Sequence, residues 1–138
     1  MATVRAYAAQ AAGAPLSPYA YELPELGADD VDIRVEHCGI CHSDLAMIDD
    51  GWGMGRYPLV PGHEVVGVVE ALGPQAKGLR VGQRVGLGWF SGSCMHCRNC
   101  LRGDQNMCAS AEQIIVGRPG GYAERVRCKA EWAVPLPV

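Results

Sequence analysis

The stretch Cys94-Met-His-Cys-Arg-Asn-Cys100-Leu-Arg-Gly-Asp-Gln-Asn-Met-Cys108 contains four cysteines. Two residues separate Cys94 from Cys97 and Cys97 from Cys100, and seven residues separate Cys100 from Cys108. Zinc prefers four such ligands in a tetrahedron at about 2.3 Å, and two-residue spacers let neighbouring thiolates converge on one ion. Four thiolates leave no open position for a substrate. The spacing therefore predicts a closed, structural zinc site formed by Cys94, Cys97, Cys100 and Cys108.

Two other interpretations of these cysteines remain open at this stage. Four thiolates also suit an iron–sulfur cluster. Free or disulfide-paired cysteines are the second alternative, but the N-terminus shows no secretory signal, and this disfavours a disulfide framework. His96 is a possible replacement ligand, although we expect it to face solvent as a loop histidine.

Outside the cysteine stretch, composition and charge indicate one soluble domain spanning residues 1–138. Hydrophobic residues make up 49% of the chain and charged residues 20%, which is ordinary for a globular protein. The net charge is only -3 and no block of like charge stands out, so we expect no nucleic-acid or membrane-surface partner. No apolar run approaches the ~20 residues of a membrane span. A cytoplasmic location is the resulting expectation.

Short strands dominate the rest of the pattern. The 18 glycines and 9 prolines divide the chain into short pieces, and several pieces alternate apolar and polar residues. One short helix is expected between Cys41 and Asp50. Gly67, inside an apolar run, predicts a bulge or close packing. The fold class is therefore a mainly β barrel or sandwich with one or two short helices. The expected strands lie at 3–8, 19–22, 31–38, 63–72, 82–90, 122–128 and 131–134.

A second constellation precedes the cysteine stretch. Cys41-His-Ser-Asp44 stands at a predicted strand-to-helix junction, and Gly62-His-Glu64 follows about twenty residues later. Alone, one cysteine and one histidine on separate segments are weak signs of a metal, because a buried thiol and a hydrogen-bonded histidine are the usual explanation. In a chain that also contains a four-cysteine motif, Cys41 and His63 are stronger evidence for a second metal site.

Taken together, these motifs resemble the zinc-dependent medium-chain alcohol dehydrogenases, in the expected order along nearly the whole chain. The turn beginning at Gly120 also resembles the turn that follows the family's zinc loop. Within the family, the chain is most similar to the branch of cinnamyl alcohol dehydrogenases and bacterial NADP-dependent aldehyde reductases, at Trp52, Tyr57-Pro-Leu-Val-Pro-Gly-His-Glu64 and Val81-Gly-Gln-Arg-Val-Gly86. The resemblance implies a GroES-like, partly open barrel with a zinc-binding loop. It also implies an enzyme that interconverts primary alcohols and aldehydes by hydride transfer with NAD(P).

The resemblance assigns roles around a catalytic zinc. Cys41 and His63 match the metal ligands, and Glu64 can replace water as a ligand during exchange. Asp44 is expected to accept a hydrogen bond from His63 and fix its tautomer. Ser43 is expected to hydrogen-bond the substrate oxygen and begin a proton relay. From the residues alone, Ser43 and Asp44 are also good helix caps, which is compatible with these roles.

Other residues match positions near the cofactor and substrate. His42 is expected to touch the cofactor pyrophosphate. Trp52, Trp89 and Phe90 are candidates for an apolar substrate pocket, with plain core or surface aromatics as the alternative. Cys38 and Cys128 match no ligand position and are expected to be ordinary buried thiols.

The chain also departs from the family pattern. The third cysteine ligand of the family's catalytic zinc, the nucleotide-binding domain and the returning tail have no counterpart in it. We therefore expect a fragment that does not turn over alcohol alone, from a parent that is a homodimer or homotetramer acting on a small-molecule alcohol or aldehyde. A non-catalytic zinc-stabilised interaction module, and a neighbouring branch acting on polyols or formaldehyde conjugates, are the rival functions.

Overall fold

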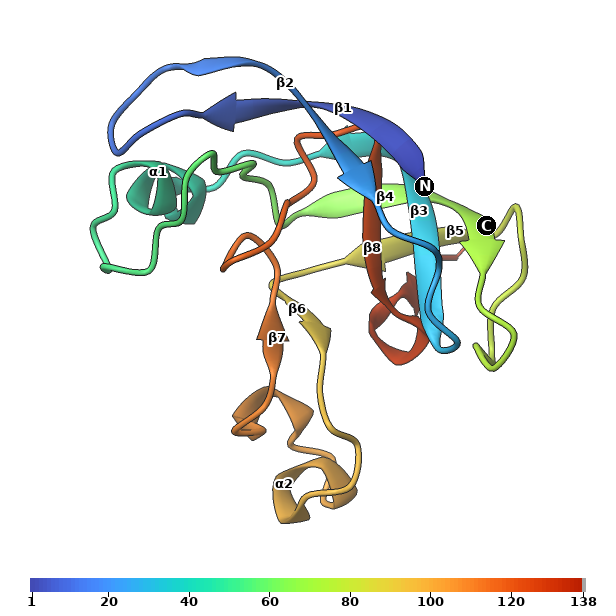
Figure 1. Ribbon diagram of the computed structural model, residues 1–138. Helices are drawn as coiled ribbons and strands as arrows, with labels where there is room; N and C mark the ends of the chain where they lie inside the picture. Colours follow the sequence, from blue (N-terminus) through green and yellow to red (C-terminus); the bar gives the residue numbers. More distant parts are fainter. Residues whose placement is uncertain (138) are drawn as a thin grey trace.

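The computed structural model describes residues 1–137, which form three small antiparallel sheets and short helices (Figure 1). None of the helices within this range is long and apolar enough to cross a membrane. The strands are β1 (Ala2–Ala9), β2 (Leu16–Leu23), β3 (Asp30–Cys38), β4 (Val65–Leu72), β5 (Arg84–Leu87), β6 (Phe90–Gly92), β7 (Glu112–Gln113), β8 (Arg125–Lys129) and β9 (Val134–Pro135). The helices are α1 (His42–Ile48), α2 (Arg98–Leu101) and the 3₁₀ turns η1 (Gln105–Met107) and η2 (Ala130–Trp132).

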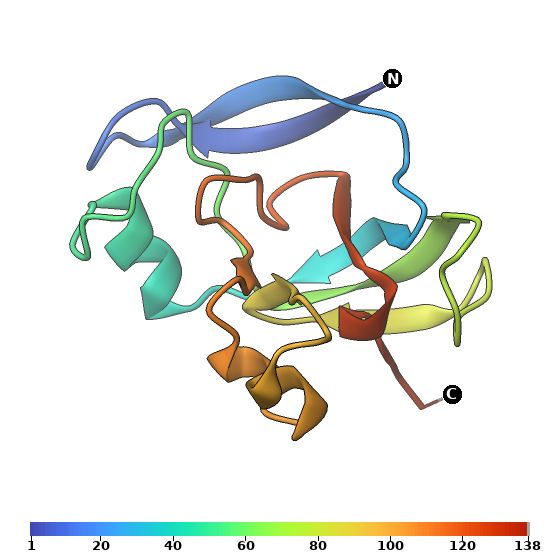
Figure 2. The ribbon, with the colours of Figure 1, turned by 60° about the horizontal axis from the view of Figure 1, so that its bottom comes forward.

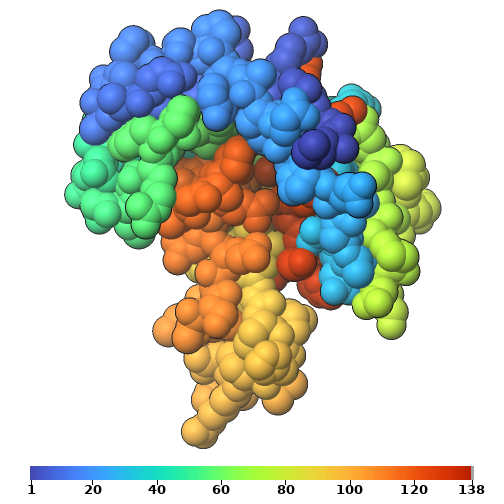
Figure 3. Space-filling view, viewed as in Figure 1, coloured from blue at the N-terminus to red at the C-terminus, as the bar shows by residue number. Residues whose placement is uncertain are grey.

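The largest sheet has the order β8-β3-β4-β5-β9, and β1–β2 forms a hairpin that lies across one end of it (Figures 1 and 2). The third sheet, the β6–β7 ribbon, extends away from the others and ends in the cysteine stretch (Figure 3). None of the three sheets closes on itself, so the expectation of a mainly β, partly open architecture is confirmed.

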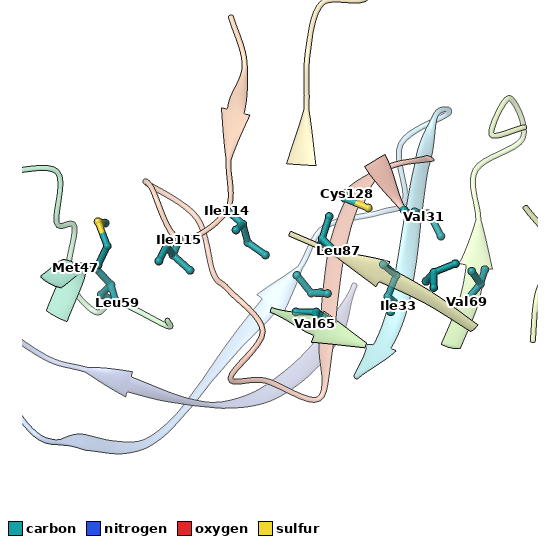
Figure 4. Packing of buried hydrophobic residues seen from close by; sticks show 13 residues of the cluster. Val31, Ile33, Met47, Leu59, Val65, Val69, Leu87, Ile114, Ile115 and Cys128 are labelled. Carbon is teal, nitrogen blue, oxygen red and sulfur yellow. The ribbon is translucent and has the colours of Figure 1, made fainter. Parts of the chain in front are cut away.

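Buried aliphatic side chains from the large sheet make up most of the core. Ile33 is completely buried and Val65 and Val69 nearly so, as their alternating positions on β3 and β4 require. The core continues past Ile114 and Ile115 to Met47 of α1 (Figure 4). This continuity fixes α1 and the segment after β7 relative to the sheet.

Close packing explains Gly67 in β4. A Cβ there would lie 2.3 Å from the backbone oxygen of Arg34 and 2.6 Å from Cγ2 of Ile33. The β3–β4 register also shifts between Val35 and His37, opposite this point. Both the bulge and the close packing expected from the sequence are therefore present.

Three strand predictions need correction. The expected strand 82–90 is two strands, because the chain leaves the large sheet at Gly88 and begins the ribbon at Phe90. The strand expected at 122–128 begins only at Arg125, since the backbone of residues 122–124 bonds to β1. The strand expected at 131–134 is mostly the turn η2, and β7 was not predicted.

Candidate metal centres

The segment from Ser93 to Ala111, which we call the cysteine lobe, brings four sulfur atoms together between β6 and β7. All four lie within 4.8 Å of one another, and the sulfurs of Cys94 and Cys100 are 3.9 Å apart. Thiolates at 2.3 Å from a tetrahedral zinc ion are separated by about 3.8 Å. The lobe therefore has the ligand number and spacing of a closed zinc site.

Backbone N–H groups point at these sulfurs. The N–H of Cys97 donates to Sγ of Cys94 at 3.3 Å, and the N–H of Cys100 donates to Sγ of Cys97, the N-cap of α2, at 3.5 Å. Sγ of Cys108 accepts from Ser110 at 3.4 Å and from Cys94 at 3.5 Å. Such donors stabilise the thiolate form, which is the form that binds metal.

The surroundings shift the pKa values of Cys94 and Cys97 in opposite directions. The N–H of His96 is the main cause that lowers the pKa of Cys94 to about 6. The N–H of Cys100 acts likewise on Cys97, but burial and hydrogen bonds to the sulfurs of Cys100 and Cys94 together raise the pKa of Cys97 to about 11. Because adjacent thiolates repel, a cation among them is what lets all four ionise, and the donor set therefore fits a divalent metal. His96 is exposed, as expected.

A second group of metal-ligating atoms lies where α1 meets the segment before β4. Cys41 is the N-cap of α1, and His63 and Glu64 immediately precede β4. One ligand atom from each of these residues lies within 4.8 Å of the others. His63 is buried, Cys41 is half-buried and Glu64 is exposed, so the group opens toward solvent on one side. The structure thus brings together the three residues that the sequence predicts for a catalytic metal.

Asp44 organises this second group. Its side chain is almost fully buried and Oδ1 lies 3.0 Å from Nδ1 of His63. The same oxygen accepts from the N–H of Gly62 at 2.8 Å, while Oδ2 accepts from the N–H of Cys41 at 3.1 Å. Because a carboxylate only accepts, Nδ1 of His63 carries the proton and Nε2 is left with its lone pair for a metal. Asp44 thus both caps α1 and orients His63.

Tyr122 is a member of this group that the sequence argument missed. Its hydroxyl donates to Oδ2 of Asp44 at 3.4 Å. Burial, reinforced by the Asp44 charge, raises the pKa of Tyr122 to about 12, which keeps the hydroxyl protonated as a donor. The only local signal was its place after Gly120-Gly121, whose N–H groups bond the carbonyls of Val60 and Gly62.

Of the three predicted pocket aromatics, Trp89 lies beside His63 and Trp52 packs against Trp89. The Trp89 ring centre is 5.0 Å from that of His63, at 76° between planes, and Trp52 is edge-on to Trp89 at 6.1 Å. Trp52 is half-exposed. Phe90 packs instead on Trp132, with the ring centres 5.7 Å apart. The structure therefore does not bring Phe90 to the tryptophan pair.

The remaining predicted residues flank the second group. His42 and Ser43 are the first two residues of α1, the histidine exposed and the serine half-buried. Cys128 is a core residue, as expected, and burial raises its pKa to about 12. Cys38 is only half-buried, and burial raises its pKa to about 11.

Residues 27–138 match the model of the alcohol dehydrogenase GroES-like domain. Among curated proteins, the chain is 53% identical over 134 residues to an aldehyde reductase of Synechocystis sp., covering 97% of this chain and 40% of that protein. It is 49% identical over 107 residues to a probable cinnamyl alcohol dehydrogenase of Picea abies, covering 78% and 30%. The chain thus spans about two fifths or less of the length of these relatives.

Solved structures show the same likeness. A cinnamyl alcohol dehydrogenase of Sorghum bicolor superposes with a TM-score of 0.92 at 36% identity, over 99% of this chain and 41% of that one. A cinnamyl alcohol dehydrogenase of Helicobacter pylori, complexed with NADP(H), gives a TM-score of 0.92 at 25% identity, over 97% and 41%. A thermostable alcohol dehydrogenase of Pyrobaculum aerophilum with bound cobalt and zinc gives 0.86 at 32% identity, over 99% and 42%.

Proposed function

Because the chain belongs to the alcohol dehydrogenase GroES-like domain family, we propose that residues 1–138 form one catalytic domain of an enzyme that interconverts primary alcohols and aldehydes with NAD(P). The cysteine lobe holds a structural zinc ion in this proposal. Cys41 and His63 hold a second, catalytic zinc ion, and Glu64 is the ligand used during exchange. The hydrogen bond between Asp44 and His63 is the observation that carries the proposal, because it sets the histidine tautomer that a metal needs.

The tryptophan pair supports an apolar substrate. Trp52 and Trp89 meet edge to face next to His63, so a carbon chain or aromatic ring bound there lies against apolar surface. Aromatic and branched aliphatic aldehydes are the substrate class that this surface fits.

Cys41 and His63 would hold the zinc ion, which would supply Lewis-acid stabilisation of negative charge on the substrate oxygen. Asp44 keeps the imidazole of His63 in one orientation through this chemistry. Ser43, half-buried at the start of α1, hydrogen-bonds the substrate oxygen and begins the proton relay: its hydroxyl takes up the alcohol proton as it passes its own proton to water or to the cofactor ribose. His42, exposed beside it, contacts the pyrophosphate of the cofactor, and NADP is the cofactor that we favour because the H. pylori relative was solved with NADP(H). A cytoplasmic homodimer or homotetramer completes the proposal.

A chimera tests this function directly. The matching 40% of the Synechocystis aldehyde reductase is replaced by this chain, and NADPH-dependent reduction of cinnamaldehyde is measured. We expect activity within about tenfold of the parent reductase, and its loss in the His63→Gln chimera. His96→Gln, which alters an exposed histidine of the cysteine lobe, is the matched control and should retain activity.

The rival interpretation, a zinc-stabilised module without catalysis, predicts another result. A folded chimera that contains zinc but lacks activity would support it and contradict our proposal. Full activity in the His63→Gln chimera would contradict the proposal as well, since the metal role of His63 would then be unnecessary.

A further inference from the structure

The β6–β7 ribbon extends from the body of the protein and carries the cysteine lobe at its far end (Figures 1 and 3). The contacts at its base include an apolar one between Phe90 of β6 and Trp132 of η2, with ring centres 5.7 Å apart. They also include a polar one that depends on Arg118, which belongs to neither strand of the ribbon.

Arg118 joins both strands of the ribbon to the large sheet. Its Nη1 donates to the hydroxyl of Ser91 in β6 at 2.9 Å and to the carboxylate of Glu112 in β7 at 3.0 Å. Its Nη2 donates to the carbonyl of Arg127 in β8. Ser91 is fully buried, and only 25% of the Arg118 side chain is exposed. A planar guanidinium is the side chain that can span three acceptors in fixed directions.

The same ribbon holds Trp89, which immediately precedes β6. The carbonyl of Trp89 accepts from the N–H of Ile114 at 2.7 Å, and its indole Nε1 donates to Oε1 of Gln113 at 3.0 Å. Gln113 follows Glu112 in β7, so the indole is tied to the strand that Arg118 holds. The ring of Trp89 in turn contacts that of His63, at 5.0 Å between centres.

We propose that Arg118 is a positioning residue: by joining Ser91, Glu112 and the Arg127 carbonyl, it sets the Trp89 indole against His63. Loss of Arg118 frees the base of the ribbon to shift, and the Trp89 ring moves with it. This proposal depends on the proposed function in one respect only: the effect on substrate binding follows if Trp89 borders the substrate. The positioning itself is measured without substrate or cofactor, so either can fail alone.

The test follows the His63 ring and the Trp89 indole N–H by NMR in the zinc-loaded full chain. A ring current from Trp89 contributes to the His63 ring-proton shifts, because the two rings are in contact. We expect Arg118→Met to remove that contribution and to move the Trp89 indole N–H resonance. Arg125→Met is the matched control: it removes an arginine that pairs with Glu70 within the large sheet, and both resonances should stay unchanged.

The Trp89→Leu variant tests whether Arg118 affects the His63 ring through Trp89. In Trp89→Leu protein, adding Arg118→Met should change the His63 resonances no further. Unchanged His63 resonances in Arg118→Met alone would overturn the proposal, as would an equal change in both backgrounds. If Arg118→Met does not fold, Arg118→Lys is judged by the same criteria, because lysine keeps the charge but cannot span all three acceptors. Global unfolding of both variants, in place of a local change, also overturns the proposal.

Discussion

Replacement of Asp44 by asparagine changes one oxygen of the buried carboxylate into an amide that donates hydrogen bonds. The two carboxylate oxygens serve different partners: Oδ1 serves Gly62 and His63, and Oδ2 serves Cys41 and Tyr122. An asparagine oxygen can occupy only one of these positions. Its NH₂ group then faces an N–H, of either Cys41 or Gly62, that has lost its acceptor.

Both orientations of the asparagine side chain carry a cost, and the cost has a known size. A backbone N–H left without an acceptor in a buried site costs about 1–3 kcal/mol. If the NH₂ faces His63, Nδ1 must accept and the proton moves to Nε2, which removes the lone pair needed for a metal. If it faces Cys41, the negative charge that orients His63 is lost. Loss of such an outer partner weakens metal binding by about 10–100-fold.

Two assays on one preparation measure these effects. Urea unfolding should show Asp44→Asn destabilised by about 2 kcal/mol. Competition with a zinc chelator should show weaker zinc binding at Cys41 and His63 and unchanged binding at the cysteine lobe. Asp49→Asn, an exposed carboxylate at the C-terminal end of α1, is the control and should alter neither quantity.

The reasoning is refuted if Asp44→Asn protein unfolds at the wild-type urea concentration and binds zinc at the second group with wild-type affinity. Equal weakening at both metal groups would also contradict it, because Asp44 contacts only the second group.

Three further predictions concern stability. A methyl group at Gly120 would lie 2.2 Å from Cγ2 of Ile115, so Gly120→Ala should lower the free energy of unfolding by about 3 kcal/mol in urea, whereas Gly88→Ala, where the space is open, should be near neutral. Arg127 and Asp32 form a largely buried two-bond ion pair at 2.7 and 3.0 Å, so Arg127→Met should cost about 3–5 kcal/mol and the double Arg127→Met/Asp32→Leu variant much less. Burial raises the pKa of the Cys128 thiol from 9.0 to about 12, so the unfolded chain loses this proton at lower pH than the folded chain. The free energy of unfolding therefore falls as the pH rises from 9 toward 12. Cys128→Ala should make that decline less steep by up to about 1.4 kcal/mol per pH unit.

The sequence predicted elements whose signal is local. The alternation around Ile33 and the apolar run around Val69 correspond to β3 and β4, since both strands are buried on a defined face. The break at Gly88 was not foreseen, because Gly82 to Phe90 is continuously strand-like. Only the packing of Trp89 on His63 and of Phe90 on Trp132 shows why the chain turns there.

In the candidate site too, the sequence predicted the features with a local signal and missed those that depend on distant contacts. Cysteine spacing predicted that the four lobe sulfurs lie together, and the family resemblance singled out Cys41, His63 and Asp44, which the structure brings together. Tyr122 and Arg118 were missed, because each acts across contacts that are distant in sequence: 78 residues separate Tyr122 from Asp44, and 27 separate Arg118 from Ser91. Phe90 was a pocket candidate beside the two tryptophans, but its ring packs on Trp132 instead.

The lobe cysteines carry the central claim, that they form a closed zinc site independent of the second metal group. Native mass spectrometry with elemental analysis of the purified chain measures this directly. We predict one tightly held zinc ion that Cys100→Ser removes and His63→Gln leaves in place. Iron with sulfide in the purified chain, or an unchanged content of tightly held zinc in Cys100→Ser protein, would contradict the account.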